Sequence, residues 1–142
     1  MATSSIESTQ VERVAFGKIP QAIVFAGVIG AVINTIIFFI GNAIGGMKIP
    51  MIMVPIMSIA LVAIGGLVYA LLGKFTKRPI TIFIILSVIV LVLDAFAPYN
   101  AMFNPPAPGV ELFNTTTFVA TELMHLVSGG LAIYAFTRRA RT

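Results

Sequence analysis

Four long apolar runs constrain this chain more than any other feature, because each is long enough to cross a membrane as a helix. A helix rises about 1.5 Å per residue, so roughly 20 residues span the hydrocarbon core of a bilayer, which is about 30 Å thick. Backbone groups in hydrocarbon must be satisfied within the segment, which favours helices, and no alternating short strands indicate a barrel. The sequence therefore predicts an all-α, polytopic membrane protein, a four-transmembrane-helix bundle. The predicted spans cover residues 20–44, 51–73, 79–97 and 116–136.

The composition supports the same conclusion. Only 10% of the 142 residues are charged, whereas 58% are hydrophobic. Soluble domains carry about 25% charged residues, so lipid is the expected medium for most of this surface. The first run is too long for the apolar core of a secretory signal, and we expect it to be retained. We expect one transmembrane domain over residues 20–137, with a cytoplasmic tail over residues 1–19 and a basic cytoplasmic tail over residues 138–142.

The positions of the basic residues predict the orientation. Cytoplasmic loops of membrane proteins carry an excess of Lys and Arg. Of the nine Lys and Arg residues, only Lys48 lies on the opposite side of the predicted spans. The sequence therefore predicts that both termini face the cytoplasm (N-in, C-in) in a multi-pass protein of the bacterial cell (inner) membrane. The other eight are Arg13, Lys18, Lys74, Lys77, Arg78, Arg138, Arg139 and Arg141.

These basic flanks also bear on the expected partners. Positive charge beside apolar runs suits contact with the anionic headgroups of a lipid bilayer. No aromatic residues alternate with the basic ones to stack on bases, so we expect no nucleic-acid partner. A larger membrane complex or a homo-oligomer stays open as a further partner.

Small residues predict where the helices approach one another. Ala22, Ala26 and Gly30 recur at four-residue spacing in the first run. Helix association in lipid depends on close packing at small residues, because lipid is as apolar as the side chains. We expect packing within the bundle, and a dimer interface is the alternative. The later glycines expected to act in the same way are Gly65, Gly66, Gly129 and Gly130.

Five polar residues inside the spans form the candidate site. Ionisable side chains at the centre of a membrane helix cost about 2.5–3.5 kcal/mol on insertion scales, so each needs an explanation. With the predicted orientation, all five occupy the middle to outer half of the membrane. They can converge in one outward-facing polar cavity that holds a proton or a ligand. They are Asp94, Glu122, His125, Asn34 and Asn42.

Glu122 and His125 are three residues apart, so they share one face of the last helix. A carboxylate and an imidazole in this arrangement can share a proton or bind a metal. Glu-x-x-His is also the spacing of di-iron bundles, but those sites need two such motifs and two further Glu residues. The chain has one His and no Cys, which excludes haem ligation by two histidines and thiolate sites. We therefore expect no metal and no cofactor.

A structural role for the same residues is the alternative. Asp94, Glu122, His125 and Asn34 can hydrogen-bond one another and hold the helices together. Hydrogen bonds between membrane helices contribute about 0.6–2 kcal/mol each, so they stabilise a bundle modestly.

The layout resembles an uncharacterised group of small bacterial membrane proteins with four spans. The resemblance rests on the size, the four runs and Met124-His125-Leu126 in the last run, ahead of small residues and a basic tail. It implies no activity. Small multidrug exporters also have four spans, but their working Glu lies in the first span, where this chain has only Asn34 and Asn42.

No nucleophile elbow, phosphate loop or HExxH motif is present, so we expect no enzyme. The first functional hypothesis is a small accessory subunit or ligand-binding membrane module. The second is a proton-coupled carrier or channel for a small molecule or ion, which would use Asp94, Glu122 and His125. The third is an intramembrane metal-dependent enzyme.

Overall fold

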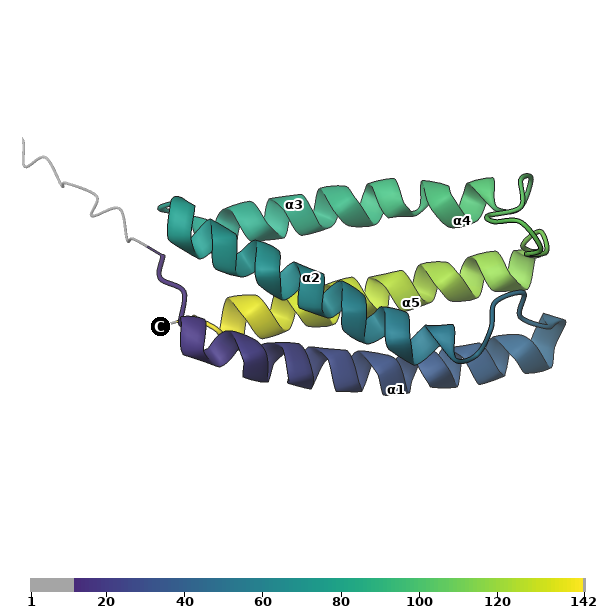
Figure 1. The fold of residues 1–142 in the computed structure, drawn as a ribbon, viewed down its shortest axis with the longest axis horizontal. Helices are drawn as coiled ribbons and strands as arrows, with labels where there is room; N and C mark the ends of the chain where they lie inside the picture. The colour runs from purple at the N-terminus through teal and green to yellow at the C-terminus, as the bar shows by residue number, and fades with distance from the viewer. Residues whose placement is uncertain (1–11, 142) are drawn as a thin grey trace, which may run out of the picture.

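The computed structural model describes residues 12–141, which form a bundle of four long helices (Figure 1). Consecutive long helices run in opposite directions, and a short helix continues the third. The all-α, four-helix prediction is confirmed, and the described residues contain no strand apart from one isolated bridge. The long helices are α1 (Ile19–Gly45), α2 (Met53–Phe75), α3 (Pro79–Asp94) and α5 (Thr115–Tyr134), and the short elements are η1 (Phe16–Lys18), α4 (Phe96–Asn100) and the π-helical turn η2 (Ala135–Arg139).

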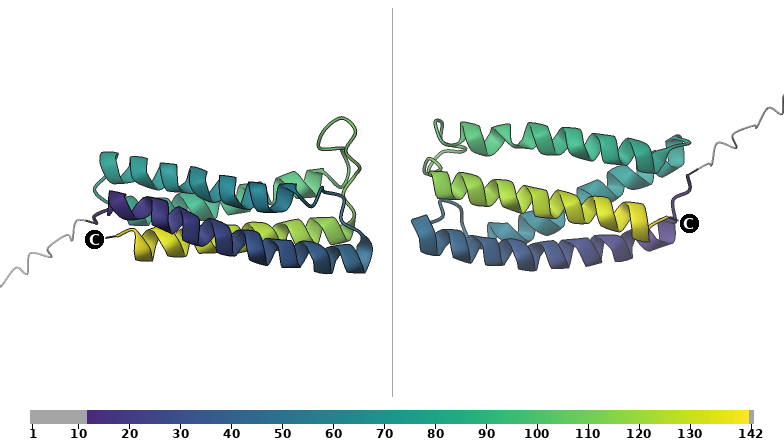
Figure 2. Two further views of the ribbon diagram at one scale, coloured as in Figure 1. Left: turned by 60° about the horizontal axis from the view of Figure 1, so that its bottom comes forward. Right: turned by 180° about the vertical axis from the view of Figure 1, so that it is seen from behind.

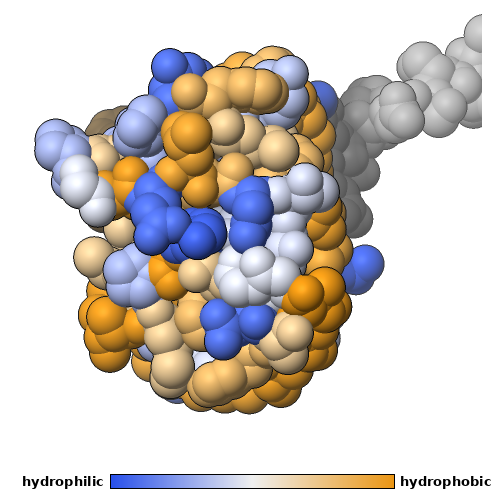
Figure 3. All heavy atoms as spheres, turned by 90° about the vertical axis from the view of Figure 1, so that its right-hand side faces the viewer, coloured by the Kyte–Doolittle hydropathy of each residue, from blue (hydrophilic) through white to orange (hydrophobic). Residues whose placement is uncertain are grey.

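Four helical segments are long and apolar enough to cross a membrane: α1, α2, α5, and α3 together with α4 (Pro79–Asn100). Large hydrophobic side chains point outward along their lengths, including Val24, Leu67 and Val92. Viewed along the bundle in Figure 3, hydrophilic residues gather over the end, whereas the flanks are hydrophobic. This distribution suits lipid around the sides and water at the ends.

The beginning and the end of the described chain meet at one end of the bundle (Figures 1 and 2). The Ala15 amide donates to the Ala140 carbonyl at 2.8 Å, beside a bridge between Val14 and Arg141. We call this the basic end, because it also holds the α2–α3 loop and all the Lys and Arg residues except Lys48. The opposite end is the loop end. The predicted tail falls partly on residues 1–11, which lie outside the described residues.

Two polar contacts close the loop end. The side chain of Asn114 accepts a hydrogen bond from the Thr117 amide at 2.7 Å, which caps the first turn of α5. Its Nδ2 atom donates to the carbonyls of Gly45 and Gly46 at 2.9 Å. Asn114 therefore joins the start of α5 to the end of α1.

Pro98 explains why the third predicted span is divided. A proline has no N–H, and its ring clashes with the carbonyl four residues earlier. That carbonyl belongs to Asp94, where α3 ends, and α4 begins at Phe96. The break therefore places a carboxylate at the last residue of α3.

The tightest packing lies near the basic end. The rings of Tyr69, Phe83 and Phe136 contact one another with centroids 5.1–5.6 Å apart. Ala22 and Ala26 of α1 are fully buried in the same core. Small residues thus bring α1 against its neighbours within the bundle.

α3 is held mainly at one end. Its only buried residues are Pro79 and Phe83, both in its first turns. The helix contains no Gly or Ala, and small residues are what allow close packing in lipid. The outer half of α3 therefore contacts its neighbours sparsely.

Glu12 fastens the start of α3. Its carboxylate accepts hydrogen bonds from the Ile80 amide at 2.7 Å and from the Thr81 amide and hydroxyl at 3.1 and 2.7 Å. A carboxylate at this position accepts hydrogen bonds from the free N–H groups of the first turn and interacts favourably with the positive end of the helix dipole. Partial burial raises the pKa of Glu12, but the hydrogen bonds from Thr81 and Ile80 and the charge of Arg78 outweigh it, so the pKa lies below 4.5.

We expect Glu12→Ala to lower the free energy of unfolding by about 1 kcal/mol at neutral pH, as loss of a helix cap does. Because the folded-state pKa is lowered, this contribution is complete above the unfolded value of about 4.5 and disappears as pH falls through the folded value. Thermal unfolding in detergent, followed by circular dichroism from neutral to acidic pH, measures it.

Glu111→Ala is the matched control, because Glu111 is an exposed acid that pairs with Lys48 at the loop end. An exposed pair contributes little, so we expect a small change. Equal losses of unfolding free energy in the two variants would show that the hydrogen bonds of Glu12 do not stabilise the start of α3.

Candidate functional site

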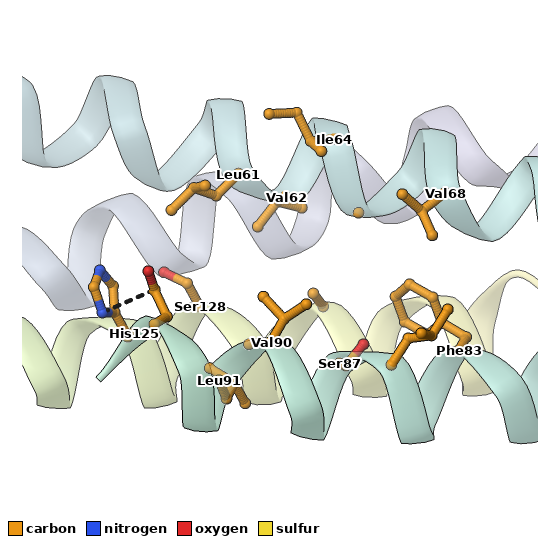
Figure 4. A pocket seen from close by; sticks show the side chains of 15 residues that line it. Leu61, Val62, Ile64, Val68, Phe83, Ser87, Val90, Leu91, His125 and Ser128 are labelled. Carbon is orange, nitrogen blue, oxygen red and sulfur yellow. Dashed lines mark ion pairs between the residues drawn. The ribbon is translucent and has the colours of Figure 1, made fainter. Parts of the chain in front are cut away.

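A cleft of about 210 Å³ lies between α2, α3 and α5 (Figure 4). Its walls are apolar along most of its length, with Val68 and Phe83 at the end nearer the basic end of the bundle. Polar side chains line only the opposite end. Those polar residues are Asp94, His125 and Ser128, and Ser87 lies between the two ends.

Asp94 and His125 face each other across the polar end of the cleft. Nδ1 of His125 lies 3.0 Å from Oδ2 of Asp94. The contact is an ion pair by distance, although the ring nitrogen has no aligned hydrogen-bond partner. The Asp94 side chain is 39% exposed, so part of its carboxylate stays available to a ligand.

The local sequence explains this juxtaposition. The Pro98 break ends α3 at Asp94. One turn beyond His125, Gly129 packs against Leu91, and a Cβ on Gly129 would lie 2.7 Å from a Leu91 methyl. The missing side chain therefore lets α3 approach α5 at the level of the polar pair.

Asn34 lies behind the cleft in a buried hydrogen-bonded cluster. Its Nδ2 atom donates to the hydroxyls of Ser58 and Ser128, both at 2.8 Å. The three residues come from α1, α2 and α5, so the cluster links three helices. Ser128 also lines the cleft and connects the cluster to it. The amide oxygen of Asn34 is buried without a partner.

The remaining two predicted residues do not line the cleft. Oε1 of Glu122 is buried and has no hydrogen-bond partner, although Glu122 lies less than one turn from His125. Asn42 is exposed near the end of α1, where its Oδ1 accepts a hydrogen bond from the Met47 amide at 3.2 Å. Of the five predicted residues, Asp94 and His125 therefore contact each other. Asn34 hydrogen-bonds Ser128, which lines the same cleft, whereas Glu122 and Asn42 do not line it.

The serines were missed because sequence reasoning weighed charged groups first. Ser128 is three residues after His125, so helical spacing places it on the same face, and that signal was available. Ser58 and Ser87 gave no such signal. Among residues 12–141, no three His, Cys, Asp or Glu side chains are grouped to hold a metal.

Comparison with known proteins gives one match. Residues 14–142 match the sequence model of a family described as a family of unknown function (DUF6069). No curated protein and no solved structure matches the chain.

We expect Asn34→Ala to lower the free energy of unfolding by about 1 kcal/mol, because the two serines lose their shared donor. Unfolding in mixed micelles, in which the fraction of a denaturing detergent is raised stepwise, measures this free energy. Asn42→Ala is the control, since Asn42 is exposed and accepts one hydrogen bond from the backbone. An equally large loss of unfolding free energy in Asn42→Ala would show that the buried cluster contributes no more to stability than an exposed hydrogen bond does.

Gly129 and Gly130 form a second matched pair. Gly129→Ala forces a methyl group against Leu91, and such overpacking costs about 1–3 kcal/mol. Gly130→Ala meets no atom within 4 Å, so we expect equal or higher stability from the better helix former. Melting temperatures in detergent compare them. If Gly129→Ala melts no lower than Gly130→Ala, close approach of α3 at this level is not needed.

Proposed function

The chain belongs to this family of unknown function, and we propose that it is a membrane module that binds a single-chain amphiphile in the cleft between α2, α3 and α5. The observation that supports the proposal most is the division of the cleft into a long apolar part and a polar end (Figure 4). An amphiphile has the same division, with an apolar chain and a polar head.

The dimensions of the cleft suit such a ligand. Phe83 and Asp94 line its two ends and are eleven residues apart on α3. At about 1.5 Å per residue this separation is about 16 Å, roughly half the hydrocarbon thickness of a bilayer. A ligand chain of this length would be about as long as one leaflet is thick.

The cleft is open to the surrounding lipid. Ile64 of α2 and Val90 of α3 line it, and each is 59% exposed. A ligand can therefore enter sideways from the bilayer. Its chain gains little by leaving lipid for an equally apolar wall, so preference for a ligand depends on the polar head. Asp94, His125 and Ser128 are the groups placed to bind that head.

A proton-coupled carrier is the second candidate, with Asp94, Glu122 and His125 moving the proton. The buried, unpartnered carboxylate oxygen of Glu122 favours it. Loss of proton-dependent flux in folded Glu122→Gln would support the carrier, and unchanged flux would eliminate it. In either case we propose that the basic end faces the cytoplasm and anionic headgroups, and a larger complex stays a proposed partner.

His125 provides a direct test of binding, because it is the only histidine in the chain. Histidine-selective ¹⁵N labelling of tag-free protein in phosphatidylcholine nanodiscs gives imidazole signals from this residue alone. We expect 1-dodecanol to shift these signals saturably. Ser87→Phe fills the cleft and should abolish the saturable shift.

Val88→Phe is the matched control, since Val88 is the next residue of α3, does not line the cleft and is 49% exposed. We expect it to behave as the unmodified protein does. No saturable shift in the unmodified protein, or the same shift in Ser87→Phe, would contradict binding in the cleft.

A further inference from the structure

We propose that the head group bound at Asp94 and His125 is a primary ammonium, so that the ligand is a single-chain cationic amine. This inference rests on the proposed function, because it names the chemistry of the head that the same cleft binds. It draws on three features of the polar end: its charge, the end of α3, and the hydrogen-bond acceptors that line it.

The charge near the polar end favours a cation. Asp94 and Glu122 are the only carboxylates in the four long helices. The nearest basic group on the same helices is His125, whose Nδ1 lies 3.0 Å from Oδ2 of Asp94. Lys48, the one basic residue at the loop end, contacts Glu111 at 2.6 Å instead. The remaining Lys and Arg residues of the described chain lie at the basic end, the far end of the bundle.

The end of α3 adds a backbone acceptor. Asp94 is the last residue of α3, and Pro98 has no N–H to donate to the Asp94 carbonyl. The carboxylate and the backbone carbonyl of Asp94 are therefore both acceptors at this end of α3.

The polar groups that line this end of the cleft can accept hydrogen bonds from a cation. The carboxylate of Asp94 and the hydroxyl of Ser128 both line it. Two further acceptors without a hydrogen-bond partner, Oε1 of Glu122 and Oδ1 of Asn34, are buried outside the lining. A primary ammonium has three N–H donors and no acceptor, so it can donate to Asp94 and Ser128 together. An alcohol brings one donor without charge, and a carboxylate head would place a second carboxylate beside Asp94.

Four dodecyl compounds separate these contributions in the single-histidine NMR titration: dodecylammonium, dodecyltrimethylammonium, 1-dodecanol and dodecanoate. Zwitterionic nanodiscs keep the bilayer itself from selecting a charge. We expect dodecylammonium to saturate the His125 shift at a concentration at least tenfold below that of 1-dodecanol, about 1.4 kcal/mol in binding free energy. Dodecyltrimethylammonium should fall between them, and dodecanoate should bind most weakly.

Asp94→Asn removes the charge that the cleft offers to the head. We expect the ratio of the dodecanol to the dodecylammonium midpoint to fall to near one, with a cooperative thermal transition confirming the fold. Glu122→Gln, outside the cleft lining, should lower the ratio in part and serves if Asp94→Asn does not fold. Glu111→Gln, an exposed acid at the same end, should leave the ratio unchanged.

The outcomes distinguish the two proposals. If 1-dodecanol binds and dodecylammonium binds no more tightly, the cationic head is wrong while the amphiphile site stands. A preference for dodecylammonium that survives both Asp94→Asn and Glu122→Gln also overturns the inference. If none of the four compounds shifts His125 saturably, the proposed function itself fails.

Discussion

No hydrophobic driving force brings helices together in a membrane, because lipid is as apolar as their side chains, and the architecture of this bundle follows from that constraint. Helices stay together where small side chains or interlocking rings bring them into close contact, or where buried hydrogen bonds join them. α1 has Ala22 and Ala26 for this purpose, and the ring cluster around Phe83 holds the first turns of α3. Beyond Phe83, α3 has mostly bulky residues, one Ser and no Gly or Ala, and its outer half stands away from α2 and leaves the cleft (Figure 1).

The position of one proline determines which polar group lies at the end of the cleft. Pro98 interrupts the helix after Asp94, and the Asp94 carboxylate lies where the apolar walls of the cleft stop. Gly129 then lets α5 bring His125 within 3.0 Å of that carboxylate. A cleft that is apolar along most of its length, open to lipid, and ends at a carboxylate and an imidazole fits the proposed amphiphile better than an ion alone.

Much of the fold could be predicted from the sequence, whereas the grouping of the site could not. Apolar runs of about 20 residues determine four helices, because hydrocarbon leaves the backbone no alternative. Helical spacing placed Glu122 and His125 on one face, yet His125 contacts Asp94 of another helix. Which residues meet across helices depends on rotation and tilt, which side-chain packing sets. Asn34 joins serines from two other helices for the same reason.

The central claim is that α3 diverges from α2 beyond its first turns, while α5 stays close to it, and that this divergence opens the cleft to lipid (Figure 1). Oxygen, which concentrates in lipid, reports this opening through its collisions with spin labels in nanodiscs. Labels at Leu86 and Val90, which line the cleft, are compared with one at Ile85, which lies outside it. We expect all three labels to be similarly accessible to oxygen. Strong protection at Leu86 and Val90, with Ile85 exposed, would show that α3 packs along its whole length and that no open cleft exists.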